Sequence, residues 1–250
     1  FFSKRSFWIY LLALFPAVIF CGRAVELNYM EQRYRARGVI SAREMDSIAK
    51  GEDVTTLTAR LPKIAEDRRL TVRRREGGPD GGLVEEQRRS LVYFDGRRRA
   101  LVFARNGVVE NVEVGVYKDL EEGRTVYAAV FQYFYLRLAI FFGCLGIFIN
   151  LFRGEMMDKT LHFWFLTPVR RRVLLLGKYV AGLTAATVIF TAGALLSWIG
   201  MLAQQDASSA SAYLSGPGYA HLFRYLLAAA LGCVGYGSVF LAAGLLLRNP

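Results

Sequence analysis

Residues 152–178 read FRGEMMDKTLHFWFLTPVRRRVLLLGK and lie between two long apolar runs. Charged residues gather at both ends of this stretch, and an aromatic and aliphatic patch occupies residues 161–166 between them. This composition is typical of a short amphipathic helix at a membrane surface. Pro168 cannot continue such a helix, and it biases Thr167 away from helical geometry. The stretch therefore predicts a cytoplasmic helix within residues 153–172 that contacts a partner protein.

The composition of the whole chain points to a membrane. The 250 residues are 54% hydrophobic and have a mean hydropathy of +0.27, which is too apolar for an ordinary soluble domain. Of the formal charge of +11, residues 23–126 supply only +3, from 21 basic and 18 acidic side chains. The rest of the basic excess lies beside the apolar runs, as expected at an anionic membrane surface. We therefore expect membrane lipid as a partner and no nucleic acid.

Four apolar runs predict four transmembrane helices, because a helix needs about 20 apolar residues to cross a membrane. Two of these runs carry small residues at four-residue spacing, a pattern that favours close packing between helices in lipid. Gly182 with Ala186, and Ala228 with Gly232, show this spacing. The predicted spans are residues 1–22, 126–152, 173–202 and 220–248. The predicted fold class is an α-helical polytopic membrane protein with at least four spans.

Residues 23–125 form a polar block, for which we predict a small α+β domain inserted between spans one and two. Its first half is helical in pattern, and Ser41 with Glu44 has the spacing of a capping box. Its second half predicts a three-stranded antiparallel meander, because two turn signals, Asp95-Gly96 and Asn106-Gly107, separate alternating runs. The runs are Leu91–Phe94, Ala100–Ala104 and Val108–Val114. Residues 73–82 read as a flexible loop, and the arginine clusters as solvated faces.

The distribution of basic residues predicts the orientation. Residues 153–178 are basic, whereas the polar loop at residues 203–219 has no lysine or arginine. Short basic loops lie in the cytoplasm, while long domains translocate largely regardless of their charge. The N-terminus and residues 153–172 are therefore predicted to be cytoplasmic, and residues 23–125 extracytoplasmic. The expected location is the bacterial cytoplasmic (inner) membrane.

Arg137 interrupts the second apolar run. An arginine at that depth either extends outward to the interface or faces the interior of a helix bundle, where it would mark a translocation path. Three tyrosines near it, at positions 127, 133 and 135, fit an aromatic belt at the membrane interface. Both interpretations of Arg137 stay open on the sequence alone.

The sequence has none of the motifs that would make this chain an enzyme. It contains no G-x-x-x-x-G-K-[ST] phosphate loop, no H-E-x-x-H and no G-x-S-x-G, so neither ATP binding in the usual manner nor hydrolase chemistry is expected. Its two histidines, His162 and His221, are isolated, and its three cysteines all lie in apolar runs as candidate small buried residues. We expect no metal, no disulfide and no catalytic residue.

Residues 152–182 resemble the corresponding part of the membrane-spanning subunits of ABC-2 type ABC transporters. Those subunits carry E-x-x-x-x-T-L-x-x-x-L-x-x-P-[VI], basic residues and L-G-K after the second span. Here Glu155, Thr160, Leu161, Pro168 and residues 176–178 occupy the corresponding positions. The bulky residues 162–164 depart from the small or aliphatic ones usual in the family. The family usually has six spans, so the resemblance implies a fragment with four of about six.

The resemblance implies that a separate ABC ATPase subunit, holding ATP and Mg, grips this segment. A second permease copy or a homologue would complete the transporter, and export is the expected direction. The implied contact residues are Glu155, Asp158, Thr160, Leu161, Phe163, Trp164, Leu166, Pro168, Arg170 and Arg171. Two alternatives remain. One is a four-span mechanotransmission-type ABC protein. The other is a non-transporting scaffold or sensor whose external domain binds a ligand or an envelope protein.

Overall fold

The computed structural model describes residues 7–75, 83–157 and 171–246. They fall into two compact units: a helical unit of residues 7–24 and 120–246, and a sheet unit of residues 25–119. Helix α1 (Phe7–Arg37) contributes its first part to the helical unit and its second part to the sheet unit. The predicted first span thus continues as an unbroken helix into the polar block.

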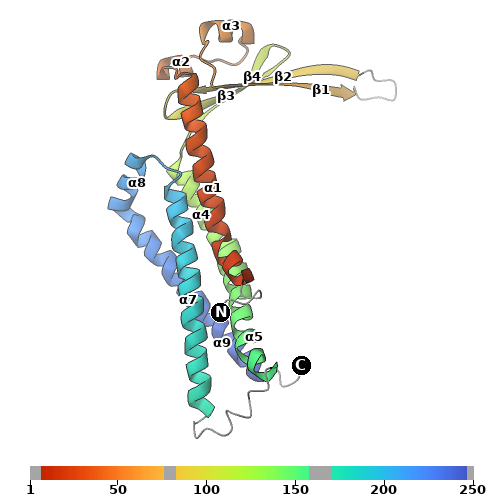
Figure 1. The fold of residues 1–250 in the computed structure, drawn as a ribbon. Coiled ribbons are helices and arrows are strands. Elements are labelled where there is room, and N and C mark those ends of the chain that lie inside the picture. The colour runs from red at the N-terminus through yellow and green to blue at the C-terminus, as the bar shows by residue number, and fades with distance from the viewer. Residues whose placement is uncertain (1–6, 76–82, 158–170, 247–250) are drawn as a thin grey trace. The chain divides into compact units, whose positions relative to one another are not determined.

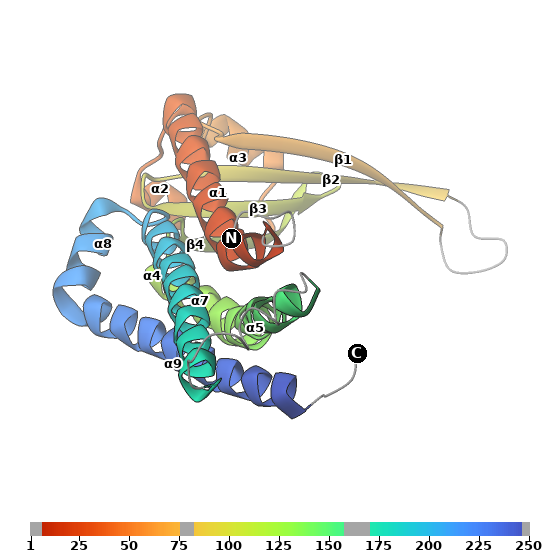
Figure 2. The ribbon, with the colours of Figure 1, turned by 60° about the horizontal axis from the view of Figure 1, so that its bottom comes forward.

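The helical unit contains three further long helical segments (Figures 1 and 2). The first joins α4 (Leu120–Ala129), η1 (Val130–Ala139) and α5 (Ile140–Met157), and the second is α7 (Arg171–Leu202). The third joins α8 (Ala207–Tyr213), η2 (Leu214–Gly218) and α9 (Tyr219–Leu246). With α1, four helices in the described part are long and apolar enough to cross a membrane. The prediction of a polytopic helical protein is confirmed.

Small residues let aromatic rings pack between these helices. Gly143 of α5 faces the ring of Phe190 on α7 so closely that a Cβ atom there would overlap it. Gly182 of α7 lies against Phe148 of α5, as its small-residue spacing predicted, and Gly237 of α9 lies against the other side of that ring. The helices α5, α7 and α9 pack against one another in pairs, and glycine lets α5 approach both α7 and α9 closely.

The polar segment at residues 203–219, predicted as a loop, contains helical structure. It includes α8 and η2, and η2 is interrupted at Gly216, whose φ of −103° and ψ of −120° are not helical. Pro217 follows directly and cannot donate a backbone hydrogen bond. The chain therefore changes direction at Gly216-Pro217 before α9 begins.

The sheet unit is a four-stranded antiparallel sheet in the order β1-β2-β3-β4. Its strands are β1 (Glu66–Arg75), β2 (Leu83–Phe94), β3 (Arg98–Arg105) and β4 (Val108–Val116). The last three confirm the predicted meander. At the β3–β4 turn, Asn106 and Gly107 both have positive φ, 50° and 86°, as a two-residue hairpin turn requires. One bulge lies between Phe103 and Ala104.

Strand β1 was not predicted, and the expected loop at residues 73–82 is partly wrong. Positions 73–75 are the end of β1 and pair with positions 85–83 of β2. Arginine-rich strands lack the clear alternation of a half-buried strand, so their sequence looks like a solvated loop. The remainder of that expected loop lies outside the described residues.

Both faces of the sheet are covered over the C-terminal part of β2. One cluster contains Leu91, Tyr93 and Val102 together with residues of α2 (Ala42–Asp46) and α3 (Val54–Arg60). On the opposite face, Val92 and Phe94 pack with Tyr34 of α1. Alternate residues of β2 thus enter two separate cores. The predicted capping box of α2 is confirmed, because the Glu44 backbone N–H donates to Ser41 Oγ and the Ser41 N–H donates to the Glu44 carboxylate.

Charged pairs between strands hold the sheet register. Arg89 of β2 donates two hydrogen bonds to Asp67 of β1, at 2.9 and 2.8 Å. These bonds are the largest cause that holds the pKa of Asp67 below its ordinary value. Glu86 is 8% exposed and accepts from both Arg88 and Arg105, and these bonds lower its pKa in the same way. Arg69 also lies 3.5 Å from Asp67, so each of the two carboxylates neutralises two arginines.

Replacing Gly193 by alanine is expected to destabilise the helical unit. A Cβ atom on Gly193 of α7 would overlap the carbonyl of Ala13 on α1, and backbone cannot turn aside as a flexible side chain can. Overpacking of this kind costs about 1–3 kcal/mol. Thermal unfolding in detergent measures the loss. Gly235→Ala is the control, because nothing lies within 4 Å of a Cβ atom there. Equal melting temperatures for the two variants would contradict the contact.

The Asp67–Arg89 pair is expected to make the sheet unit less stable in acid. A carboxylate with a lowered folded pKa stabilises the fold above its unfolded pKa, and this contribution is lost as pH falls through the folded value. Arg89→Met should therefore cost about 1 kcal/mol near neutral pH and progressively less as the pH falls through the lowered pKa of Asp67. Protease resistance of the sheet unit in the full chain, followed in urea, measures this. Arg97→Met at an exposed position is the control, and a pH-independent loss in Arg89→Met would argue against the pair.

Candidate functional site

The predicted contact segment lies mostly outside the described residues. Of its ten predicted residues, only Glu155 and Arg171 fall within described backbone, near the end of α5 and at the start of α7. The other eight, from Asp158 to Arg170, lie between the two helices and outside the described residues. The contact with an ATPase stays a prediction for all ten.

The helices on either side of that segment pack against each other. Helix α5 precedes it and ends at Met157, while α7 follows it and begins at Arg171. The two helices are in direct contact through Gly143 with Phe190 and through Phe148 with Gly182. Any partner that bound the segment would therefore hold the ends of two packed helices.

Arg137 lies on the exposed side of η1 within the helical unit. Its guanidinium carbon is 5.2 Å from the ring centroid of Tyr133, which is itself 61% exposed. This is the distance of a cation–π contact. The arrangement places Arg137 outside the core of a single helical unit. Whether a second copy makes this face part of a translocation path stays a prediction.

Tyr127 and Tyr135 do not form an aromatic belt, so that interpretation was wrong for these two residues. Both are almost fully buried, with 2% and 1% exposure, whereas Tyr133 is exposed as predicted. The Tyr135 hydroxyl donates to the Phe190 carbonyl at 2.6 Å, and the Tyr127 hydroxyl donates to the Ala194 carbonyl at 3.1 Å. A buried hydroxyl needs such a partner. The burial of these tyrosines could have been found from the spacing of the sequence. Residues 127, 131, 135 and 139 are four positions apart, and all four are buried.

Between α4 and α5 the helix has π geometry for ten residues, Val130–Ala139. π-helical stretches are rare, usually short, and often found at functional positions. This one carries Phe131 and Tyr135 into the core, where Phe131 stacks on Tyr135 with ring centroids 5.7 Å apart. Nothing in the sequence pattern distinguishes it from an α-helix. It lies in the helix that leads to the predicted contact segment.

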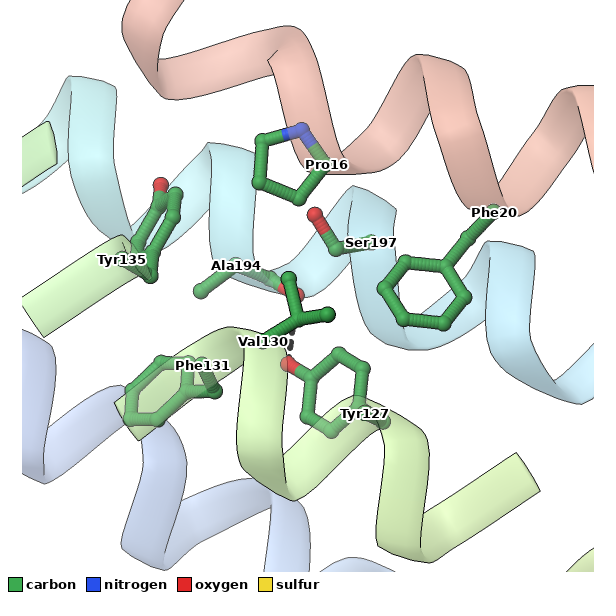
Figure 3. A pocket seen from close by; sticks show the side chains of 8 residues that line it. All are labelled: Pro16, Phe20, Tyr127, Val130, Phe131, Tyr135, Ala194 and Ser197. Carbon is green, nitrogen blue, oxygen red and sulfur yellow. Dashed lines mark hydrogen bonds between the residues drawn. The ribbon is translucent and has the colours of Figure 1, made fainter. Parts of the chain in front are cut away.

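A small cavity lies among these aromatic residues (Figure 3). Its volume is about 10 Å³, which is room for one water molecule at most. The view shows Tyr127 bonded to the Ala194 carbonyl beside it. Its lining consists of Pro16, Phe20, Tyr127, Val130, Phe131, Tyr135, Ala194 and Ser197. A single helical unit thus offers no substrate-sized space here, and this cavity is a packing feature.

The described polar residues form no reactive cluster. No group of three or more His, Cys, Asp or Glu that could hold a metal occurs among residues 7–75, 83–157 and 171–246. His221 shares a hydrogen bond of 2.9 Å with the Tyr213 hydroxyl across the bend at Gly216. Cys144 and Cys233 are buried as predicted, while Cys21 is exposed within its unit, and all three are free thiols.

The geometry defines a class of protein: a multi-pass helical membrane protein whose apolar helices are joined by a basic, aromatic segment. A family model for the ABC-2 family transporter proteins matches residues 2–247 of the chain. The chain therefore belongs to the ABC-2 transporter family and is a membrane-spanning permease. No curated protein and no solved structure matches it.

Removing the buried Tyr135 hydroxyl is expected to weaken the contact between η1 and α7. Tyr135→Phe deletes one hydrogen bond to a backbone carbonyl and leaves the ring in place, at a cost of about 1 kcal/mol. Tyr133→Phe removes a hydroxyl from the same η1 segment at a 61% exposed position and should change nothing. Thermal unfolding of the two purified variants measures the difference. A Tyr135→Phe protein as stable as Tyr133→Phe would show that the bond contributes little.

Proposed function

We propose that the chain is the permease half of an ATP-driven exporter and that a separate ABC ATPase subunit drives it through residues 153–172. Permeases of the ABC-2 family generally act with such a subunit, and membership of the family is the observation that carries the proposal. The described part of this chain supplies transmembrane helices, and the ATPase subunit would hold ATP and Mg. The predicted orientation places residues 153–172 in the cytoplasm, on the same side as the ATP.

The placement of the segment supports this coupling. It joins α5 to α7, whose rings and glycines fit closely together. Closely packed interfaces shift between discrete arrangements and do not deform smoothly. A subunit that pushed on the segment would therefore move α5 and α7 as packed elements. Their movement would reach η1 through the Tyr135 hydrogen bond to α7.

The chemistry of the contact follows from the sequence of the segment. Leu161, Phe163 and Trp164 would enter an apolar groove on the ATPase and supply most of the binding energy. The charges of Glu155 and of Arg170 to Arg172 would fix the orientation. Aromatic residues contribute strongly to interfaces because each buries a large area.

The test is a single charge placed in the predicted apolar contact. Leu161→Asp should reduce both recovery of the ATPase subunit with the permease and stimulation of its ATP hydrolysis more than tenfold, because the carboxylate would lose its water in the groove. The complex is purified in mild detergent and its composition read by mass spectrometry of the intact assembly. The matched control is Val114→Asp, which places the same charge at an exposed apolar position of the sheet unit.

Two results would overturn the proposal. One is unchanged ATPase coupling in a folded Leu161→Asp protein, which would place the contact elsewhere. The other is a gently purified native complex that contains no ATPase at all. That second result would favour the scaffold or sensor alternative, with the sheet unit as the functional part.

A further inference from the structure

One edge of the sheet is open along its whole described length. Strand β1 pairs with β2 on one side and with no described strand on the other. Before Arg88, residues 83–87 of β2 pair with β1 and with no other strand, so the two strands form an arm that extends past β3 and β4 (Figure 1). A two-stranded ribbon is marginally stable by itself in water. An unpaired edge is also a template for another strand.

The opposite edge of the sheet is covered where β4 begins. The Gly51 N–H donates to the Val109 carbonyl at 2.8 Å, and the Val109 N–H donates to the Glu52 carbonyl at 2.9 Å. Val54 adds a third bond, to the Gly107 carbonyl at 2.8 Å. The segment that leads into α3 therefore shields this edge, and no described segment shields β1 in the same way. This cover ends at Val109, so among the described residues β4 is shielded only at its start, whereas β1 is open along its whole described length.

Strand β1 exposes apolar side chains at its surface. Leu70 is 63% exposed and Val72 is 37% exposed, and residues two apart on a strand lie on the same face. Arg68 and Arg69 precede them. Charged residues on an edge normally prevent pairing with other chains. In β1 the order of the charged residues is compatible with one symmetric pairing of two β1 strands.

The candidate registers can be compared by charge. A symmetric antiparallel pair of β1 strands must have its two-fold axis at a residue, because residues opposite each other lie on the same face. An axis at Arg69 would place two Arg69 side chains opposite each other. An axis at Thr71 would place Arg68 and Arg69 opposite positions 74 and 73, both arginine in the sequence. Like charges directly opposite each other are destabilising.

An axis at Leu70 avoids every such clash. Leu70 then lies opposite Leu70 of the second copy, Arg69 opposite Thr71, and Arg68 opposite Val72. The acidic positions 66 and 67 fall opposite the basic positions 74 and 73. Opposite-charge and apolar pairs across strands each contribute favourably. This register pairs acid with base at both ends and leucine with leucine at the centre.

We propose that β1 pairs antiparallel with β1 of a second copy of this chain, with the two-fold axis at Leu70, so that two four-stranded sheets become one. The contact is isologous and therefore closes as a dimer without extending into a filament. It occupies the open backbone edge and covers Leu70. It requires only a second copy of the chain and does not rest on the ATPase coupling.

The register predicts a disulfide from a single substitution. In Leu70→Cys, two copies present their cysteines directly opposite, with Cα atoms about 4.5–5.5 Å apart, within the range that a disulfide spans. Oxidation with copper phenanthroline of membranes containing the full chain should convert most of it to a covalent dimer on non-reducing gels. Leu70 is exposed, so the substitution should leave the fold intact.

Thr71→Cys is the matched control. It is the next residue on the strand but faces the other side of the sheet and lies diagonal to its own copy, about 7–8 Å away. It should give at least fivefold less dimer, and the unsubstituted chain sets the background from exposed Cys21. Absence of a Leu70→Cys dimer, or equal dimer from Thr71→Cys, would overturn the proposal. Either result would leave ATPase recovery unchanged, so the two proposals fail separately.

Discussion

The helical unit depends on close approach between helices at small residues. In lipid, apolar side chains gain little by leaving one apolar surface for another, so helices associate through packing and hydrogen bonds. At Gly143, Gly193 and Gly237, a neighbouring ring or backbone occupies the space that a Cβ atom would need. Larger residues at these positions would separate the helices, and the rings of Phe190 and Phe148 would lose their contacts.

The same closeness explains the buried tyrosines. Once α7 lies near η1, the Tyr127 and Tyr135 hydroxyls reach carbonyls of that helix. Each carbonyl has a second lone pair beyond the one used within its own helix, so the helix need not break to accept the bond. The interface thus satisfies two polar groups that lipid could not. The π-helical geometry of η1 places both Phe131 and Tyr135 on this face.

Features that depend on neighbouring residues could be predicted from the sequence. The capping box at Ser41 and the hairpin turn at Asn106-Gly107 need only local residues, and both are confirmed. Strand β1 could not be found in this way, because its stability comes from cross-strand partners such as Arg89 with Asp67. Tyr127 and Tyr135 point inward because α7 packs against the helix face that carries them. Amino-acid composition contains no information about that packing. The contact segment was recognised by residue type alone, and its geometry lies outside the described residues.

The two units differ in how their backbone hydrogen-bonding groups are satisfied. In the helical unit the helical segments satisfy their own backbone, and association depends on shape. In the sheet unit the last strand on each side leaves backbone groups unpaired, so each edge needs a solution. At the start of β4 the chain supplies residues 51–54 as a cover. For β1 it supplies charges, whose order along the strand excludes the neighbouring symmetric registers and permits the one at Leu70. An arrangement of that kind both protects a single copy from indiscriminate pairing and selects an identical strand as its partner.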